Sequence, residues 1–144
     1  MTQLPKDEEL HRIEAAREQA QREMFASIER QRTEQAEAQA DGIPALMRLV
    51  EIAHLRGAGD TSQNHHVRRF LLGLYNGSRW PFDMTRLRCI DADLQRDALA
   101  VLRMDVNPAK EVHCYIEGGT KLFNSWWEAE DAHDAWQKKQ AEEG

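Results

Sequence analysis

The chain has 144 residues, of which 41% are hydrophobic and 31% are charged, and its formal net charge is −6. This length suits one domain, and the mean hydropathy of −0.73 predicts that part of the chain is a solvated extension. No run approaches the roughly 18 apolar residues that span a bilayer, and the polar start MTQLPKDEELHR predicts no secretory signal. We therefore expect a soluble, cytoplasmic protein without a membrane partner, with Cys89 and Cys114 as free, buried thiols.

The charge is unevenly distributed along the chain. Residues 1–41 carry a net charge of −4, residues 42–119 carry +1, and residues 120–144 carry −3. Acidic ends weaken the attraction of the whole molecule to nucleic acid, because phosphate contacts dominate that affinity. A local basic face in the middle of the chain stays open.

Residues 6–40 contain no Gly or Pro and are rich in Glu, Gln, Arg and Ala, which favour helices. Oppositely charged residues three or four apart, such as Glu18 and Arg22, add about 0.2–0.5 kcal/mol each. The apolar positions are sparse: Leu10, Ile13, Ala20, Met24, Phe25 and Ile28. The pattern predicts a long charged helix in residues 1–41 whose first two-thirds dock on a surface.

Residues 42–137 have the signals of a helical domain. Asp41-Gly42 is expected to end the long helix, and Pro44 suits the first turn of another. Residues 43–55 place apolar residues on one face, and a further helix is expected from Asp60 or Thr61 to Asn76-Gly77. The apolar positions of these two helices are Leu46, Leu49, Val50, Ala53, Val67, Phe70, Leu71 and Leu74.

The second half of the domain has its own start and stop signals. Asp83 is expected to cap a short turn, Asp91 to cap a helix over 92–104, and Thr120 to cap the last helix. Trp80 and Phe82 are expected to tuck under the helices, and residues 138–144 to fray. The predicted fold class is all-α, a compact bundle of about four to five helices preceded by a long charged N-terminal helix. The expected core includes Phe70, Leu71, Leu74, Leu94, Leu102 and Trp126.

Five segments carry a family resemblance: LMRLVEIA (46–53), DTSQ (60–63), VRRFLLGLYN (67–76), FDMTRL (82–87) and the residues from Ile90 to Val101. They resemble a family of small uncharacterised bacterial helical domains, often encoded on plasmids and integrated mobile elements. The resemblance covers roughly residues 43–127 and implies a helical fold and a mobile-element setting, with no activity. The long N-terminal helix lies outside it.

Metal binding and catalysis find little support. The possible metal ligands are His54, His65, His66, Cys89, His113, Cys114 and His133. Adjacent ligands such as His65-His66 point about 100° apart on a helix, unlike the usual spacing of zinc ligands. No phosphate-binding loop or nucleophile motif is present, and a helix dipole accounts for Asp91, Asp93 and Asp97 at a helix start. We expect no metal, no cofactor and no enzyme activity.

Nucleic-acid binding is the alternative to a protein partner. Seven arginines and no lysine lie between Arg68 and Arg103, and Arg68, Arg69, Arg79 and Arg86 form the candidate contact set. The segment 84–104 has the spacing of a helix-turn-helix, but Asp93 and Asp97 occupy the start of its second helix, where base contacts are usually made.

Protein binding has positive support. The N-terminal helix has too narrow an apolar stripe to be stable without packing, so it folds back on its domain, pairs with a second copy or docks on another protein. Adjacent helical tryptophans cannot both face one core, so one of Trp126 and Trp127 is expected at the surface, where Trp is common in binding hot spots. The predicted partner contacts are Leu10, Ile13, Met24 and Trp127. The function predicted is therefore helical protein–protein interaction.

Overall fold

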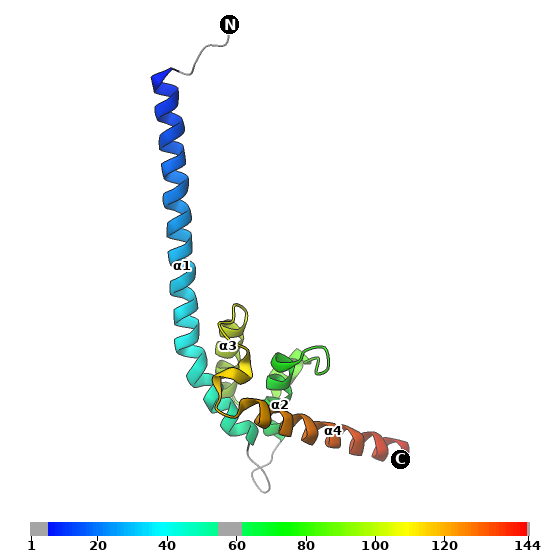
Figure 1. Cartoon of the computed structure of the whole chain (residues 1–144). Coiled ribbons are helices and arrows are strands. Elements are labelled where there is room, and N and C mark those ends of the chain that lie inside the picture. The colour runs from blue at the N-terminus through cyan, green and yellow to red at the C-terminus, as the bar shows by residue number, and fades with distance from the viewer. Residues whose placement is uncertain (1–5, 55–61, 144) are drawn as a thin grey trace. The chain divides into compact units, whose positions relative to one another are not determined.

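The computed structural model of the protein describes residues 6–54 and 62–143. These residues form four α-helices, α1 (Asp7–His54), α2 (Ser62–Tyr75), α3 (Ala92–Asp105) and α4 (Gly119–Glu143), and two 3-10 turns, η2 (Met84–Cys89) and η3 (Val112–Tyr115) (Figure 1). The described residues contain no strand, so the predicted all-α class, with a long N-terminal helix before a bundle, is confirmed. Among the helices described, none has the length and apolar character needed to cross a membrane.

The chain divides into two compact units, Met1–Glu37 and Ala38–Gly144. In the first unit the described structure is a single helix, the part of α1 from Asp7 to Glu37. The second unit contains residues 38–54 of α1 together with all the later elements. The bundle and its core belong to this second unit.

The expected helix break at Asp41-Gly42 is wrong, because α1 continues through Gly42 and Pro44 to His54. Gly42 instead marks a close approach of two helices. A Cβ atom at Gly42 would lie 2.7 Å from Met104 Cβ and 3.2 Å from the Ala100 carbonyl oxygen of α3. The contact with α3 offsets the roughly 1 kcal/mol that glycine costs in a helix.

The core of the second unit combines residues from every helix. Its fully enclosed side chains include Leu46 and Leu49 of α1, Leu71 of α2, Val101 of α3 and Trp126 of α4. Trp80 is buried, as expected, from the loop between α2 and η2. Two expected core residues, Leu74 and Leu102, are only partly buried and pack against the edge of this cluster.

Side chains of α2 complete the end of α1. The Asn64 amide donates to the carbonyl of Ile52, and Arg68 Nε donates to the carbonyl of Ala53 at 2.7 Å. The last carbonyls of a helix have no partner within it, so these bonds cap α1 from a neighbouring helix. The expected caps at Asp60 or Thr61 lie outside the described residues.

The predicted caps of the second half are partly confirmed. Asp83 caps η2 by accepting the Thr85 backbone N–H at 2.9 Å. Asp91 is the N-cap of α3 but makes no side-chain cap bond; its own N–H donates to Gln63 of α2 at 2.7 Å. The prediction for Thr120 is wrong, because α4 already begins at Gly119, where a Cβ atom would collide with the His113 carbonyl.

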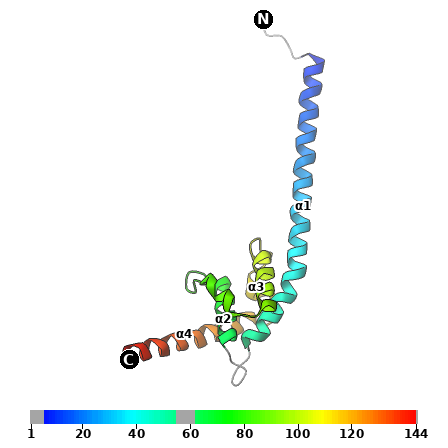
Figure 2. The same cartoon turned by 180° about the vertical axis from the view of Figure 1, so that it is seen from behind.

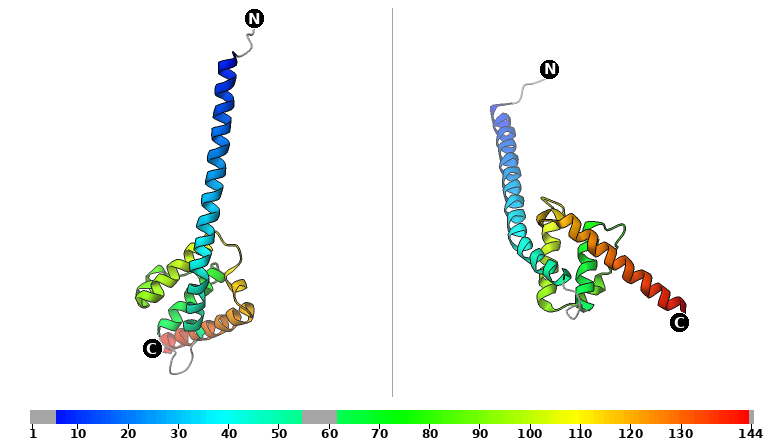
Figure 3. Two further views of the ribbon diagram at one scale, coloured as in Figure 1. Left: turned by 90° about the vertical axis from the view of Figure 1, so that its left-hand side faces the viewer. Right: turned by 60° about the horizontal axis from the view of Figure 1, so that its bottom comes forward.

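Helix α4 packs on α2, and its C-terminal end extends beyond α2, as Figures 1 and 2 and the right panel of Figure 3 show. Residues 138–143 of the expected fraying tail are helical and exposed. Trp136, in the second half of α4, is 59% exposed, whereas Trp126, in the first half, is enclosed.

Candidate functional site

The helix of the first unit carries large apolar side chains that are exposed. They share one side of the helix, within about 120° of its circumference at 100° per residue. Their exposed fractions are Leu10 42%, Ile13 54%, Met24 56%, Phe25 63% and Ile28 37%. We call these five residues the apolar face. Three of the predicted partner contacts, Leu10, Ile13 and Met24, belong to it.

Residues 14–23, which include no large apolar side chain, divide the apolar face into two clusters. Leu10 and Ile13 form the first cluster, and Met24, Phe25 and Ile28 form the second, with Arg17 at the same side of the helix between them. The other sides of the helix carry polar side chains, some of which bond to one another, as Gln19 does to Glu23. The face is therefore a discontinuous stripe on a helix with otherwise polar sides.

The fourth predicted contact, Trp127, lies elsewhere. Its ring is partly buried and packs edge-on against Trp80 and Tyr75, with centroids 5.7 Å and 6.3 Å away. The expectation of an exposed tryptophan at 126 or 127 is therefore wrong. The loop between α2 and η2 supplies Trp80 as a partner for Trp127, which helical spacing alone does not reveal.

A buried carboxylate organises the contact between α2 and α4. Glu130 is 2% exposed, and its Oε1 accepts a hydrogen bond of 2.6 Å from His65 Nδ1. Arg69 Nε lies 3.6 Å from the same oxygen, and the Arg69 guanidinium also pairs with Asp134. A buried charge is tolerated only where it is paired and hydrogen-bonded, and Glu130 meets both conditions.

Arg86 of η2 joins the same set of contacts, and we call Glu130, His65, Arg69 and Arg86 the Glu130 network. Arg86 Nη1 lies 3.3 Å from His65 Nε2 and 3.1 Å from His66 Nδ1, so the guanidinium is within hydrogen-bond distance of both imidazole rings. Burial lowers the pKa of His66 below 6.5, and the charge of Arg86 lowers it further. Both histidines are partly buried.

The arginines of the nucleic-acid alternative have partners inside the protein. Arg68 is buried against α1, Arg69 and Arg86 belong to the Glu130 network, and Arg79 pairs with Asp131. Arg69 and Arg79 also lie over the Trp80 ring, at 4.6 Å and 4.2 Å from its centroid. Because these four arginines already contact groups within the protein, their guanidinium groups are less available to bind phosphate.

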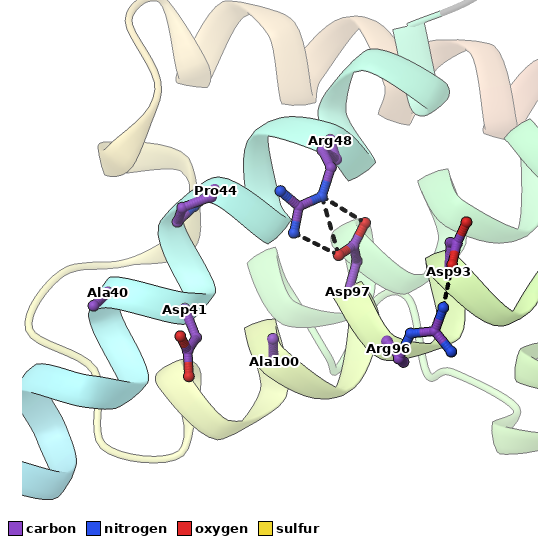
Figure 4. A pocket seen from close by; sticks show the side chains of 8 residues that line it. All are labelled: Ala40, Asp41, Pro44, Arg48, Asp93, Arg96, Asp97 and Ala100. Carbon is purple, nitrogen blue, oxygen red and sulfur yellow. Dashed lines mark hydrogen bonds and ion pairs between the residues drawn. The ribbon is translucent and has the colours of Figure 1, made fainter.

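An open pocket of about 600 Å³ lies between α1 and α3, within the second unit (Figure 4). Arg48 donates to both carboxylate oxygens of Asp97, at 2.8–3.2 Å. Asp93 and Arg96 form a second pair at the rim. The other lining residues are Ala40, Asp41, Pro44 and Ala100. The arginines that line the pocket pair with aspartates, and Asp41 lies 3.7 Å from Arg103. The charged residues described at this pocket are therefore all paired, which leaves none free for acid–base chemistry.

The two thiols are exposed, so the expectation of buried cysteines is wrong. Cys114 Sγ lies 3.5 Å from His113 Nε2, because the turn η3, unlike an α-helix, brings these neighbours together. Among the residues that the structure describes, no group of three His, Cys, Asp or Glu could hold a metal ion. Two of the candidate ligands, His65 and His133, have ring centroids 4.8 Å apart at an interplanar angle of 52°, and His65 is hydrogen-bonded to Glu130.

Sequence reasoning missed Glu130 and the role of Asp97. Both are acids within an apolar stripe: Glu130 follows Phe123 and Trp126 at helical spacing, and Asp97 lies between Leu94 and Val101. A charged residue at a core position is the signal that could have identified them, since such residues are almost never buried without a partner.

Comparison with protein families gives one match. A model described as a family of unknown function, DUF7673, matches residues 43–131. The chain belongs to DUF7673. Neither the search of curated proteins nor the search of solved structures gave a match.

The DUF7673 match contains several of the internal polar contacts of the bundle, whereas Asp134, which pairs with Arg69, lies outside it. It includes Arg48 and Asp97, and it ends one residue after Glu130. The apolar face at residues 10–28 lies outside the match. The matched residues all belong to the second unit, and the apolar face belongs to the first.

Proposed function

We propose that this DUF7673 protein is a non-enzymatic protein–protein interaction module that acts as an adaptor or inhibitor by stoichiometric binding through the apolar face. One observation carries this proposal: five large apolar side chains are exposed on one side of a helix. The bundle has its own core without them. The mobile-element setting implied by the resemblance makes a host or element-encoded complex the expected target.

The energetics favour binding by this helix. Burying a large apolar side chain contributes about 1.5–3 kcal/mol, so a partner that covers the face gains several such contributions. The helix is already formed in residues 7–37, which reduces the ordering cost that disordered binding segments bear. Helix-in-groove recognition uses anchors at this kind of spacing.

The other two function classes receive less support. The polar groups of the pocket and of the Glu130 network are engaged with one another, so neither of these two described sites assembles an acid, a base and a nucleophile. The arginines proposed for nucleic acid are held by internal contacts. No observation specifically favours nucleic-acid binding, so we propose only the protein partner.

The test is affinity capture of the tagged full-length protein from its native host lysate, with and without nuclease, read by mass spectrometry. The expected result is a protein partner that survives nuclease and is lost when Ile13→Asp and Phe25→Asp are introduced together.

A matched control places the same charges on the opposite side of the helix. Ala15 and Ala26 lie about 140–160° from Leu10, so Ala15→Asp with Ala26→Asp should retain the partner. Equal capture by both double variants would overturn the proposal. Partners that disappear with nuclease would instead support the arginine alternative.

A further inference from the structure

We infer that His66 and Arg86 form an acid-sensitive contact that holds the segment 82–89, which contains η2, against α2 and releases it when His66 is protonated. The inference goes beyond the proposed function and does not depend on it, because both residues belong to the second unit and the apolar face belongs to the first. It follows from the way the segment is held and from the charges around His66.

The segment 82–89 lies between two buried residues, Trp80 before it and Ile90 after it. Within the segment, by contrast, no residue of η2 is buried. Parts of a fold with few buried apolar contacts open locally at low free energy while the rest of the structure stays intact. The segment can therefore leave α2 without unfolding the bundle.

Two contacts of the segment with its neighbours carry no titrating group. Phe82 packs edge-on against Phe70 of α2, with ring centroids 5.4 Å apart, and we call this pair the phenylalanine contact. The carbonyl of Leu87 accepts a hydrogen bond of 2.8 Å from Gln95 of α3. Because these groups keep the same charge near neutral pH, any pH dependence of the segment must come from Arg86 and the histidines.

The contact between Arg86 and His66 depends on the charge of the imidazole. A guanidinium carries only hydrogen-bond donors, and a protonated imidazole also carries only donors. Once His66 is protonated, its ring offers Arg86 no acceptor, and two positive charges face one another across the 3.1 Å contact. Protonation therefore changes a contact that holds the segment into one that repels it.

The charges nearest to His66 act in the same direction. Among the described residues, the groups whose charges act on its ring are Arg86 of η2, His65 of α2 and Glu130 of α4. Burial lowers the pKa of His66 below 6.5, and the charges of Arg86 and His65 lower it further, against the weaker opposite effect of Glu130. When the segment leaves, His66 loses both the burial and the facing charge, so protonation favours the open arrangement.

The outer charges of the Glu130 network are already balanced. Arg69 pairs with Asp134 and lies 3.6 Å from Glu130, so Arg69 and Arg86 together match the two carboxylates while the histidines are neutral. Glu130 also accepts a hydrogen bond from His65. A proton on His66 therefore adds a positive charge that no further carboxylate of this network compensates.

Two-dimensional NMR of the full-length protein between about pH 7.5 and about pH 5 tests the inference, since histidines change charge in this range. Cross-relaxation between the two rings of the phenylalanine contact should be lost at the lower pH, and the amide signals of residues 84–89 should shift. The signals of the core residues Leu46 and Leu49 should stay in place. Retention of the phenylalanine contact over the whole range overturns the inference, and so does its loss together with the core signals, which would show unfolding of the whole bundle.

Three variants assign the effect to one pair. His66→Gln keeps an acceptor for Arg86 at every pH, and Arg86→Gln removes the facing charge while its amide both donates and accepts. The phenylalanine contact should therefore persist at about pH 5 in both variants. His133→Gln is the matched control, because it removes a neighbouring imidazole whose ring packs 4.8 Å from that of His65; here the contact should still be lost. Persistence in His133→Gln, or loss in both other variants, would show that the pair of His66 and Arg86 is not responsible and would overturn the inference.

Discussion

His65 Nδ1 donates to Glu130 Oε1 at 2.6 Å, across the contact between α2 and α4. The histidine is also held from its other nitrogen by Arg86, so one imidazole connects α2, α4 and η2. This connection makes the buried charge of Glu130 a structural element of the bundle, and it motivates the first two predictions.

Glu130→Ala should lower the free energy of unfolding by about 3 kcal/mol, because it leaves the largely buried Arg69 charge without its inner partner. Chemical denaturation followed by circular dichroism measures the change. Asp134→Asn, which removes the half-exposed partner of the same arginine, should cost less than about 1 kcal/mol. Equal losses in both variants would show that burial of Glu130 has no special weight.

Stability should fall as the pH decreases through 6.5. The folded pKa of His66 is lowered, so the unfolded chain takes up a proton at a higher pH than the folded chain does, and protonation favours unfolding. The loss ends once the pH is below the folded pKa as well. Denaturation at about pH 7.5 and about pH 5.5 tests this, and His66→Gln should reduce the difference while His11→Gln, in the first unit, should not.

Gly42→Ala should destabilise the protein by about 1–3 kcal/mol through overpacking against Met104. An ordinary exposed helical glycine gives the opposite sign, since alanine then stabilises by about 1 kcal/mol. The sign of the change in melting temperature therefore decides whether α1 and α3 approach one another closely at Gly42 in solution.

Arg48→Met should destabilise the bundle, because it leaves the largely buried Asp97 carboxylate without its bidentate partner. Asp97→Asn in the same chain should recover part of the lost stability, since it removes the uncompensated charge. A double-mutant cycle measures this coupling. Additive effects of the two substitutions would contradict the contribution we assign to the pair.

Local signals in the sequence predict most of the helices, and distant contacts account for the errors. The end of α2 at Tyr75 and the cap of η2 at Asp83 depend on residues within a few positions. Asp41-Gly42 locally predicts a helix end, but Gly42 lies within α1 where it packs closely against Met104. Where a contact with a distant helix decides whether a helix continues, the neighbouring residues in the sequence do not reveal it.

The polar contacts of the bundle were similarly hidden. Glu130 binds a residue 65 positions away, and Asp97 binds one 49 positions away. Periodicity places both acids on apolar faces, but it does not identify His65 or Arg48 as their partners. By contrast, the spacing of Leu10, Ile13 and Met24 is enough to place these residues on one side of a helix.

The placement of the four tryptophans gives the protein a built-in optical reporter. Trp80 and Trp126 are enclosed, Trp127 is packed against Trp80, and Trp136 alone is largely exposed to solvent. Replacing Trp136 by phenylalanine would leave intrinsic fluorescence that arises entirely from the bundle, shielded from water-borne quenchers. Its emission would then follow the integrity of the aromatic layer between α2 and α4 without an added dye.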